Sequence, residues 1–256
     1  MRRPWRGLAP ALLLGAVLSA CGNDGPTFGA PRGATRQGRD IFRLWQGSMW
    51  AAVAVGVFVW ALILFAVIRF RRRSGDDDAV PKQTHANIPL EIVYTAAPLV
   101  IVAILFLVNV RTQDRVDHVS ADPAVTVEVT AFQWQWRFRY RDAGVEVVGT
   151  PEEDPVMVLP AGSTVRLVLR TTDVQHSFYV PEFLYKRDAV PGITNELDLE
   201  VLEEGRYDGR CAEFCGLLHD RMDFVVEAVS RAEFDRWIAE QRTSPNVGGT
   251  AMGAGR

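Results

Sequence analysis

The sequence contains little cysteine, and this scarcity excludes several classes of protein. Of 256 residues only three are cysteines, Cys21, Cys211 and Cys215, which is too few for a fold held together by disulfides. No Cys-x-x-Cys-His motif is present, so a covalently attached c-type haem is excluded. No internal repeat is visible at a period of about 20–50 residues either.

The chain also lacks an excess of basic residues, although its formal net charge of −3 averages two unlike parts. Residues 1–110 carry 12 Lys and Arg against 6 Asp and Glu, whereas residues 111–242 carry 15 against 25. The acidic second part argues against nucleic acid as a partner, because phosphate binding needs a basic face. It favours a basic partner protein.

The N-terminus is typical of an exported protein. Basic residues precede an apolar stretch at 8–20, whose length lies within the roughly 7–15 residues of a signal-peptide core. The stretch ends in Leu-Ser-Ala-Cys at 18–21, which resembles the bacterial lipobox, in which the cysteine is lipidated and becomes the new N-terminus. We predict a signal peptide at 1–20 and a lipidated, flexible segment at 21–43, with Cys21 as the lipidated residue. An ordinary signal peptide followed by a chance cysteine is the alternative.

Two long apolar runs predict a pair of membrane-spanning helices. The first run, 49–68, has no charged residue, and at about 1.5 Å per residue it is long enough for the ~30 Å hydrocarbon core of a bilayer. A second run, at about 88–110, contains one charged residue, Glu91, near its start. We therefore predict a transmembrane hairpin at 44–112, with helices at about 47–69 and 88–110. A buried helix of a soluble protein is the alternative for each run.

The segment between the two runs is rich in basic residues: Arg69, Arg71, Arg72, Arg73 and Lys82. By the positive-inside rule, we predict that the loop 69–87 is cytoplasmic and that the regions before and after the hairpin lie outside. This topology fits a bacterial inner-membrane protein with a lipid-anchored N-terminus on its outer side.

From about residue 119 the sequence changes to the period of β-strands. Residues 125–130 alternate apolar and polar side chains, as a half-buried strand does. Similar short runs, separated by turn residues, lie at 133–140, 145–148, 156–159, 164–170, 193–202 and 224–229. Several short strands at this spacing predict a β-sandwich or barrel at 119–242.

The chain ends in a short helix and a polar tail. Residues 231–241 have an amphipathic pattern, and Ser230 with Glu233 can form a capping box at the helix N-terminus. Residues 243–256 are rich in Gly, Ser, Pro and Ala, and we predict that they are disordered.

The most informative segment runs from Cys211 to Met222 and reads Cys-x3-Cys-x3-His-x2-Met. Thiolate together with thioether selects copper over hard cations, whereas zinc would use Cys and His but has little use for Met. A mononuclear blue-copper site uses one Cys and two His, so two thiolates indicate a pair of bridged copper ions. A disulfide between Cys211 and Cys215 is the alternative, and the following His219 and Met222 argue against it.

A bridged pair of copper ions needs a second histidine as a terminal ligand, and the chain offers few. Only four histidines exist: His85, His118, His176 and His219. His85 lies in the predicted cytoplasmic loop, and His118 follows the second membrane helix directly. His176 follows the strand predicted at 164–170, in a loop that can return to the cysteine segment. It is therefore the best candidate, although without the cysteine motif it would be read as an ordinary surface residue.

Residues 40–240 resemble subunit II of haem–copper cytochrome c oxidases that carry a binuclear copper (CuA) site. The resemblance rests on the two-helix hairpin, the run Gln-Trp-Gln-Trp at 133–136, the segment Asp173…His176-Ser177-Phe178, and the complete loop from Cys211 to Met222. It implies a cupredoxin-like β-sandwich with Greek-key connections for the exported domain. Quinol-oxidising relatives lack the copper loop, so its presence implies cytochrome c as the electron donor.

The resemblance also implies the roles of individual ligands. Cys211 and Cys215 would bridge the two copper ions, with His176 and His219 as terminal ligands. Weaker ligands would be Met222 on one copper and the backbone carbonyl of Glu213 on the other. The side chain of Glu213 would bind a magnesium ion shared with subunit I, and the haem would lie in that partner subunit only.

Two further residues take roles from the resemblance. In a strand, Trp134 and Trp136 point to the same face; Trp136 is expected to be core or interface, whereas Trp134 would be exposed and would receive the electron from cytochrome c. Glu91 would lie near the cytoplasmic mouth of a proton pathway in subunit I. Alternatively, Glu91 is an interfacial carboxylate whose side chain only reaches the water.

The sequence therefore predicts the electron-receiving subunit of a proton-pumping oxidase, assembled with subunits I and III. Oxygen chemistry would reside in subunit I. A membrane-tethered copper-delivery protein is an alternative, but it needs fewer fixed ligands and no two-helix hairpin. The copper domain of nitrous oxide reductase shares the copper loop, yet 256 residues leave no room for the large catalytic domain of that enzyme.

Overall fold

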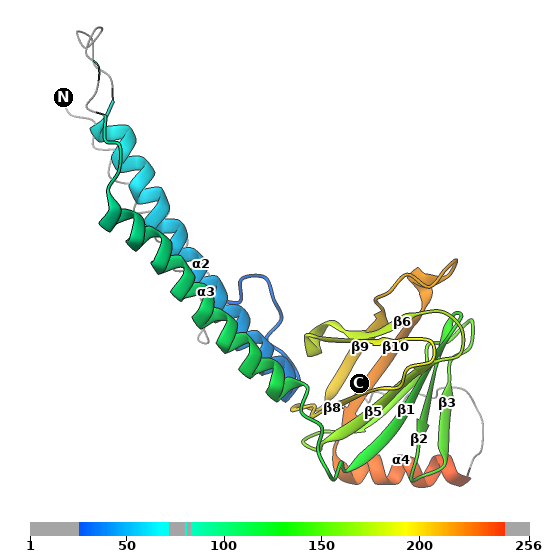
Figure 1. Cartoon of the computed structure of the whole chain (residues 1–256). Coiled ribbons are helices and arrows are strands. Elements are labelled where there is room, and N and C mark those ends of the chain that lie inside the picture. The colour runs from blue at the N-terminus through cyan, green and yellow to red at the C-terminus, as the bar shows by residue number, and fades with distance from the viewer. Residues whose placement is uncertain (1–25, 72–79, 81–82, 244–256) are drawn as a thin grey trace, which may run out of the picture. The chain divides into compact units, whose positions relative to one another are not determined.

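The computed structural model describes residues 26–71, 80 and 83–243 (Figure 1). The predicted signal peptide, Cys21 and residues 244–256 of the predicted tail lie outside the described residues. The chain divides into two compact units. One contains Trp45–Gln83 together with the residues up to Ala30, and the other contains Pro31–Leu44 together with the chain from Thr84 onward.

The first long helix, α2 (Arg36–Arg69), begins well before the predicted start at about residue 47. The hydroxyl of Thr35 accepts a hydrogen bond from the Gly38 amide at 2.9 Å, as the side chain of an N-cap residue does. The apolar pattern marks only the stretch that suits a bilayer, so it does not reveal the polar first turns of α2.

The predicted flexible segment at 21–43 is wrong for the part of it that the structure describes. Thr35 forms a β-bridge with Val201, and α2 already begins at the next residue. Gly33 has a φ of +79°, and a Cβ on it would lie 2.4 Å from the backbone of Gly38. The glycines of this segment therefore allow a tight turn and close packing, where composition alone suggested flexibility.

The second long helix, α3 (Ile88–Val116), begins where the sequence predicts and ends later than the predicted residue 110. Asn87 caps it, with its side-chain oxygen accepting the Leu90 amide at 3.3 Å. The polar residues 111–116 continue the helix beyond the apolar run. Both α2 and α3 are long and apolar enough to cross a membrane.

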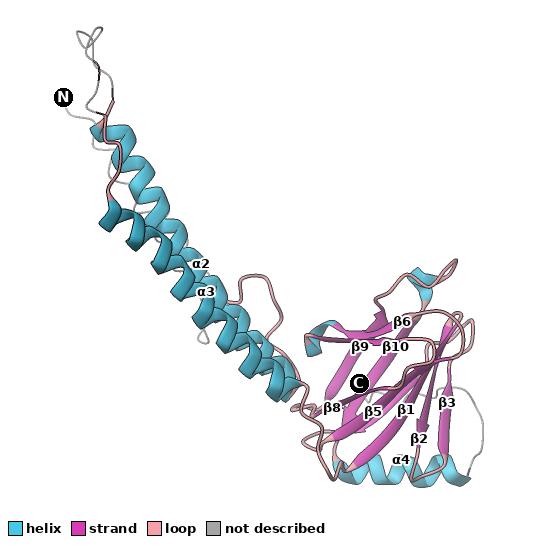
Figure 2. Cartoon of the chain, viewed as in Figure 1, coloured by secondary structure: helices cyan, strands magenta, loops and turns pink. Residues whose placement is uncertain are grey.

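Two five-stranded sheets form the β domain, the cupredoxin-like sandwich that the sequence predicts (Figure 2). One sheet has the order β3 (Val145–Val148), β2 (Gln135–Tyr140), β1 (Val125–Phe132), β5 (Val165–Thr171) and β8 (Asn195–Leu199). The other has the order β4 (Val156–Pro160), β10 (Asp223–Val229), β9 (Gly205–Cys211), β6 (His176–Val180) and β7 (Tyr185–Ala189). The chain crosses repeatedly from one sheet to the other, as Greek-key connections do.

Three strands, β6, β7 and β9, were not predicted from the sequence, and others have different ends. Strands β7 and β9 are polar, with the sequences Tyr-Lys-Arg-Asp-Ala and Gly-Arg-Tyr-Asp-Gly-Arg-Cys, so they show no clear alternation. The strand predicted at 193–202 is the shorter β8. The strand predicted at 133–140 begins at Gln135, because Gln133 and Trp134 form the turn between β1 and β2.

Aromatic side chains from both sheets fill the core next to the cysteine loop. Trp136, Phe178 and Phe224 are almost completely buried, and their ring centroids lie 4.6–6.0 Å apart. Tyr140 ties the two sheets together, because its hydroxyl donates to the carbonyl of Val158 at 2.9 Å and accepts from the amide of the same residue at 2.8 Å. Trp136 is thus a core residue.

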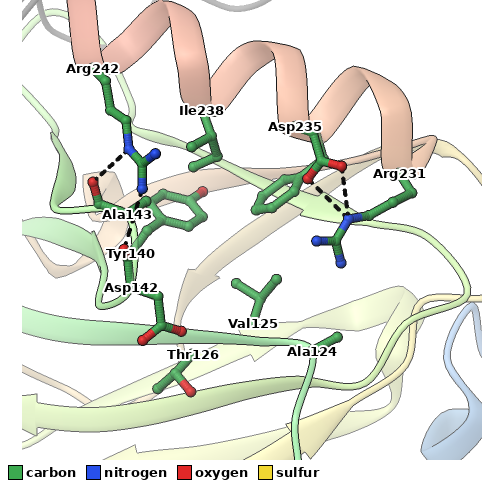
Figure 3. Close-up of a pocket in the computed structure, with 11 residues that line it drawn as sticks. Ala124, Val125, Thr126, Tyr140, Asp142, Ala143, Arg231, Asp235, Ile238 and Arg242 are labelled. Carbon is green, nitrogen blue, oxygen red and sulfur yellow. Dashed lines mark hydrogen bonds and ion pairs between the residues drawn. The ribbon is translucent and has the colours of Figure 1, made fainter.

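The C-terminal helix α4 (Arg231–Thr243) packs on the sandwich through Phe234 and Trp237. The predicted capping box is confirmed, since Glu233 accepts from the amide and hydroxyl of Ser230, which accepts the Glu233 amide in return. A groove of about 320 Å³ lies between α4 and the strands (Figure 3). Arg242 closes one end by donating to the carbonyls of Asp142 and Ala143.

Candidate metal centre

The antiparallel pairing of β6 with β9 brings together ligand candidates that lie far apart in the sequence. His176 is the first residue of β6 and Cys211 is the last residue of β9. Phe178 pairs with Cys211 in the register of the two strands, so His176 and Cys211 lie at the same end of the sheet. The loop that follows Cys211 contributes the remaining candidates before β10 begins.

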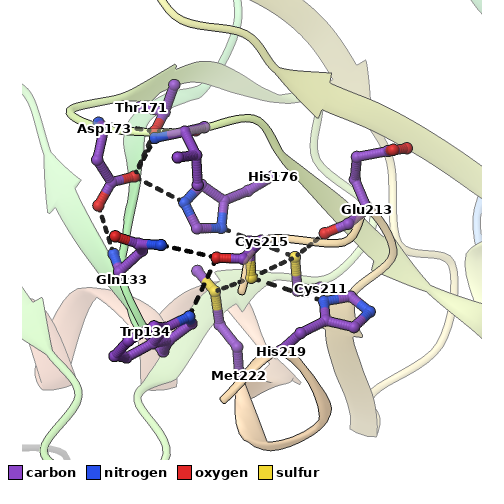
Figure 4. A network of polar contacts seen from close by, with 11 residues as sticks. Gln133, Trp134, Thr171, Asp173, His176, Cys211, Glu213, Cys215, His219 and Met222 are labelled. Atoms are coloured by element: carbon purple, nitrogen blue, oxygen red, sulfur yellow. Dashed lines mark hydrogen bonds and ion pairs between the residues drawn. The ribbon is translucent and has the colours of Figure 1, made fainter. Parts of the chain in front are cut away.

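All five predicted side-chain ligands of copper converge at this end (Figure 4). The Sγ atoms of Cys211 and Cys215 lie 3.9 Å apart. His176 Nδ1 lies 3.8 Å from Cys211 Sγ, and His219 Nδ1 lies 3.6 Å from Cys215 Sγ. Met222 Sδ lies 3.8 Å from Cys215 Sγ. The two thiols are therefore flanked by one imidazole each, and the thioether lies against one of them.

Most of this cluster is closed off from water. His176 and Met222 are 0% exposed, and Cys211 and Cys215 are 5% and 3% exposed. His219 is only half-buried and lies at the rim. The ligand atoms of His176, Cys211 and Cys215 all lie within 4.8 Å of one another, so a single small ion can contact all three.

The surroundings of the two thiols favour one thiolate in the absence of metal. Burial by itself would raise the pKa of Cys211, but hydrogen bonds, first with His176 and then with the backbone of Glu213 and Ser177, lower this pKa to about 6. The pKa of Cys215 is raised to about 12, first by burial and then by the neighbouring Cys211. A bound metal cation would deprotonate both.

Asp173 holds the ring of His176 in place. Its Oδ1 lies 2.8 Å from His176 Nε2, which leaves Nδ1 free to face the sulfur atoms. Its Oδ2 accepts the Gln133 amide at 2.6 Å. Burial acts to raise the pKa of Asp173, but the hydrogen bonds from His176, Gln133 and Val174 outweigh it and lower the pKa. A carboxylate behind a ligating imidazole is a common feature of metal sites, where it fixes the tautomer and the ring orientation.

The turn between β1 and β2 lies directly against the cysteine loop. Gln133 Nε2 and Trp134 Nε1 both donate to the backbone carbonyl of Cys215, at 2.8 Å and 3.1 Å. Trp134 is half-buried and packs on the core. The expectation that Trp134 lies in a strand beside Trp136 is wrong, because it lies in the turn, with its indole directed at Cys215 and partly exposed (Figure 4).

The backbone and the side chain of Glu213 have different surroundings. Its carbonyl oxygen lies 3.2 Å from Cys211 Sγ, so the backbone faces the thiols. Its carboxylate points away from the sulfur atoms, is 42% exposed, and lies 3.4 Å from Lys186 Nζ (Figure 4). Lys186 and the side chain of Gln133 were not identified from the sequence. Only the strand register and the turn bring them to the site.

Glu91 is the one predicted site residue that lies in a membrane helix, and the metal cluster does not include it. It lies in the first turn of α3, where its carboxylate accepts the Asn87 amide at 3.0 Å. His85 and His118 are also not part of the cluster among the described residues.

The donor atoms fit copper better than the other common metals. Two thiols, two imidazoles and a thioether are soft ligands, and the thioether in particular distinguishes copper from zinc. Two sulfur atoms 3.9 Å apart, each with its own imidazole, suit a pair of bridged ions better than a single one. The fold and these donor atoms together define a class, that of membrane proteins with a cupredoxin-like metal-binding domain.

Comparison with known proteins narrows this class to one family. Residues 125–229 match the family model "Cytochrome C oxidase subunit II, periplasmic domain", and residues 27–111 match "Cytochrome C oxidase subunit II, transmembrane domain". The "Probable cytochrome c oxidase subunit 2" of Nocardia farcinica is 38% identical over 92% of this chain and 80% of its own length. The protein of the same name from Streptomyces avermitilis is 38% identical over 93% of this chain and 88% of its own.

The chain therefore belongs to the cytochrome c oxidase subunit II family. Among solved structures, the periplasmic domain of subunit II (CoxB) of Bradyrhizobium japonicum is 29% identical, with a TM-score of 0.46. The match covers 49% of this chain and 99% of that one. Membership of this family makes the chain a subunit of an oxidoreductase.

Replacing Asp173 by Asn should weaken metal binding without removing a ligand. Asn has the same shape but lacks the charge, and its amide group cannot accept from both His176 and the Gln133 backbone. Loss of a carboxylate behind a ligating His typically costs about 10–100-fold in metal affinity. A copper titration against a competing chelator measures the affinity, with Asp235→Asn on α4 as the control. Equal affinity in Asp173→Asn and the native chain would show that Asp173 does not support the site.

Proposed function

We propose that this chain is the electron-receiving subunit of an aerobic cytochrome c oxidase. It takes electrons from cytochrome c at a binuclear copper (CuA) centre and passes them to the haem of subunit I, which reduces oxygen to water and pumps protons. The observation that carries the proposal is the convergence of two thiols, two imidazoles and one thioether at one end of the sandwich. When bound there, copper would supply one-electron exchange.

The chain itself supplies rigidity and low polarity to this centre. Cys211, Cys215, His176 and His219 would hold the two copper ions. Met222 and the carbonyl of Glu213 would be weaker ligands. Strand ends, a buried core and the Asp173 carboxylate hold these groups before metal arrives, which suits electron transfer because little has to move between oxidation states.

Trp134 is proposed as the point where the electron enters. Its indole is half-exposed and is bonded through Nε1 to the carbonyl of Cys215, a bridging ligand. The contact gives a short path of covalent bonds and one hydrogen bond from the surface to the copper centre. Gln133 bonds to the same carbonyl and holds the turn in register with the cysteine loop.

The surface around the site suits a cytochrome c with a basic face. Exposed apolar side chains on the loops at this end are Val174, Phe214, Leu217 and Leu218. Beside them a cleft of about 590 Å³ borders His219 and is lined by the acidic residues Asp154, Asp208, Asp220 and Asp223. An apolar contact area with acidic residues next to it would steer and then hold a basic electron carrier.

The carboxylate of Glu213 is proposed to bind magnesium together with subunit I. It points away from the copper ligands and is partly exposed, so a group from another subunit can reach it. In this structure the ammonium group of Lys186 lies 3.4 Å from the carboxylate. This ion pair is consistent with a position suited to positive charge, and Lys186 would have to move when magnesium binds.

The membrane arrangement is proposed from the sequence and supported by local contacts. Two helices span the inner membrane, the loop 69–87 is cytoplasmic, and the copper domain lies on the outer side beside subunits I and III. Trp45 Nε1 donates to the carbonyl of Thr27 at 3.2 Å, and the rings of Phe28 and Trp50 meet edge to face. Tryptophans at this end of the apolar run mark the membrane interface. Lipidation of Cys21, which precedes Thr27 in the sequence, is proposed from the sequence alone.

The test of the function is isolation of the membrane complex through a tag on this chain. We expect a haem-containing subunit to co-purify, two copper ions per copy of this chain, and rapid oxidation of reduced cytochrome c. Because the domain is acidic, the rate should fall as salt shortens the screening length from ~30 Å at 0.01 M to ~3 Å at 1 M. The matched control replaces both Cys211 and Cys215 by Ser. A complex without haem, or one that oxidises cytochrome c equally well in the Ser variant, would refute the proposal.

Trp134→Leu should slow electron uptake from soluble cytochrome c by more than an order of magnitude. The substitution removes the aromatic ring and the bond to the Cys215 carbonyl, while every metal ligand stays. Stopped-flow mixing measures the rate of copper reduction, and the copper absorption spectrum shows whether the centre is intact. Trp134→Phe, which keeps a ring but loses the N–H donor, should be slowed less. An unchanged rate in the Leu variant with an intact spectrum would exclude the role.

Glu91→Gln separates a role in proton uptake from a role in capping α3. The Gln amide oxygen can still accept the Asn87 amide, so the helix start is kept while the exchangeable carboxyl proton is lost. If Glu91 admits protons, turnover should slow while electron transfer into copper stays at the native rate. Glu91→Ala, which loses the cap as well, serves as the comparison. A native turnover rate in Glu91→Gln would show that Glu91 only caps the helix and takes no part in proton uptake.

A further inference from the structure

The segment Pro31–Leu44, called here the N-terminal clamp, joins the β domain by backbone pairing. The Ala34 amide donates to the Glu182 carbonyl at 2.7 Å, and the Ala34 carbonyl accepts the Leu202 amide at 2.9 Å. The Arg36 amide donates to the Glu200 carbonyl at 3.0 Å. The clamp is therefore bonded to two separate connections of the sandwich, the one after β6 and the one after β8.

Side chains strengthen the same junction. Arg36 binds Glu200 through two bonds, Nε to Oε2 at 2.6 Å and Nη2 to Oε1 at 2.7 Å. Arg39 pairs with Glu203 at 3.0 Å. Thr35 is completely buried between them. Such a two-pronged guanidinium–carboxylate pair fixes direction as well as distance.

Close packing leaves the clamp little freedom to shift. A Cβ on Gly38 would lie 2.5 Å from the carbonyl oxygen of Phe183, so the first turn of α2 touches the backbone of the domain. The end of α3 is held as well, because the Tyr185 hydroxyl donates to Asp117 at 2.7 Å. Asp198 accepts the Ser120 amide at 2.6 Å just beyond it.

The clamped connections belong to the strands that carry metal ligands. Strand β6 starts at His176 and runs directly into Pro181–Phe183, which faces the clamp. Strand β9 follows Glu200 and Glu203 and ends at Cys211. The ligands and the clamped residues are thus at opposite ends of two short, hydrogen-bonded strands, so a displacement at one end is transmitted to the other.

Attaching the β domain to the membrane helices would not by itself require these contacts of the N-terminal clamp. An ion pair with an exposed partner adds little to folding stability, and Arg36 is 67% exposed. A flexible linker would keep the domain attached equally well. Electron tunnelling, however, falls exponentially with the distance between redox centres, so a domain that moves on a linker would transfer electrons slowly for much of the time.

We propose that the N-terminal clamp is a positioning device, in which the Arg36–Glu200 pair fixes the copper-binding strands relative to the first turns of α2 and so sets the distance to the electron acceptor in subunit I. This inference rests on the proposed function. It assigns Arg36 and Glu200 as positioning residues that contact neither metal nor donor.

The test uses the intact complex with Glu200→Arg, which places two like charges against each other. A light-triggered electron from labelled cytochrome c gives two phases, reduction of copper and then transfer from copper to haem. We expect the second phase to slow several-fold, while the first phase and the copper spectrum stay native. The exchanged pair Arg36→Glu with Glu200→Arg should restore the second phase. Asp235→Arg, which breaks the comparable pair with Arg231 on α4, is the control and should change neither phase.

Hydrogen exchange at the Ala34 and Leu202 amides reports on the clamp without any electron transfer. Faster exchange in Glu200→Arg shows that the clamp has opened. If the Arg variant does not assemble, the milder variant Glu200→Gln is measured in its place.

Two outcomes would overturn the inference. One is faster exchange together with a native rate of the second phase, and the other is unchanged exchange. If copper in the native complex accepts no electron in the first phase, the proposed function is wrong. Hydrogen exchange still reports whether the clamp opens, so failure of the proposed function is distinguished from failure of the clamp inference.

Discussion

The pairing of β6 with β9 is the interaction on which the rest of the structure depends. It places the start of one strand beside the end of the other, so that His176 and Cys211, which are 35 residues apart, face each other at 3.8 Å. Strand β9 is polar, and the pair is held in place by the aromatic residues behind it. Trp136, Phe178 and Phe224 form that support, and the Trp136 indole also donates to the Met222 carbonyl at 3.3 Å.

The metal site and the proposed path of the electron share one set of hydrogen bonds. Asp173 holds His176 on one side and the turn at Gln133 on the other. Two side chains of this turn, Gln133 and Trp134, donate hydrogen bonds to the carbonyl of Cys215. A single carboxylate therefore links the imidazole of His176 to the turn that contacts the cysteine loop.

Sequence patterns predicted the parts of this chain that depend on local chemistry. The apolar runs marked the helices that can cross a membrane, and the loop from Cys211 to Met222 identified a soft metal site, because ligand type and spacing are properties of a short segment. The polar turns at the start of α2 and at the end of α3 were missed, since no apolar pattern marks them. Strands β7 and β9 were missed for the same reason, and Trp134 was assigned to a strand because a two-residue turn leaves the alternation almost intact.

What the sequence by itself determined is which residues are candidate metal ligands and the membrane character of the chain, both of which follow from the residue types in short segments. Only the tertiary structure decided which residues support the site. Gln133 and Asp173 reach it from other loops, and Ala34 and Arg36, in the segment 21–43 that composition predicted to be flexible, are bonded to the connections after β6 and β8. The physical reason is that hydrogen bonds between distant segments depend on strand register and close packing, and neither is encoded in any single stretch of residues.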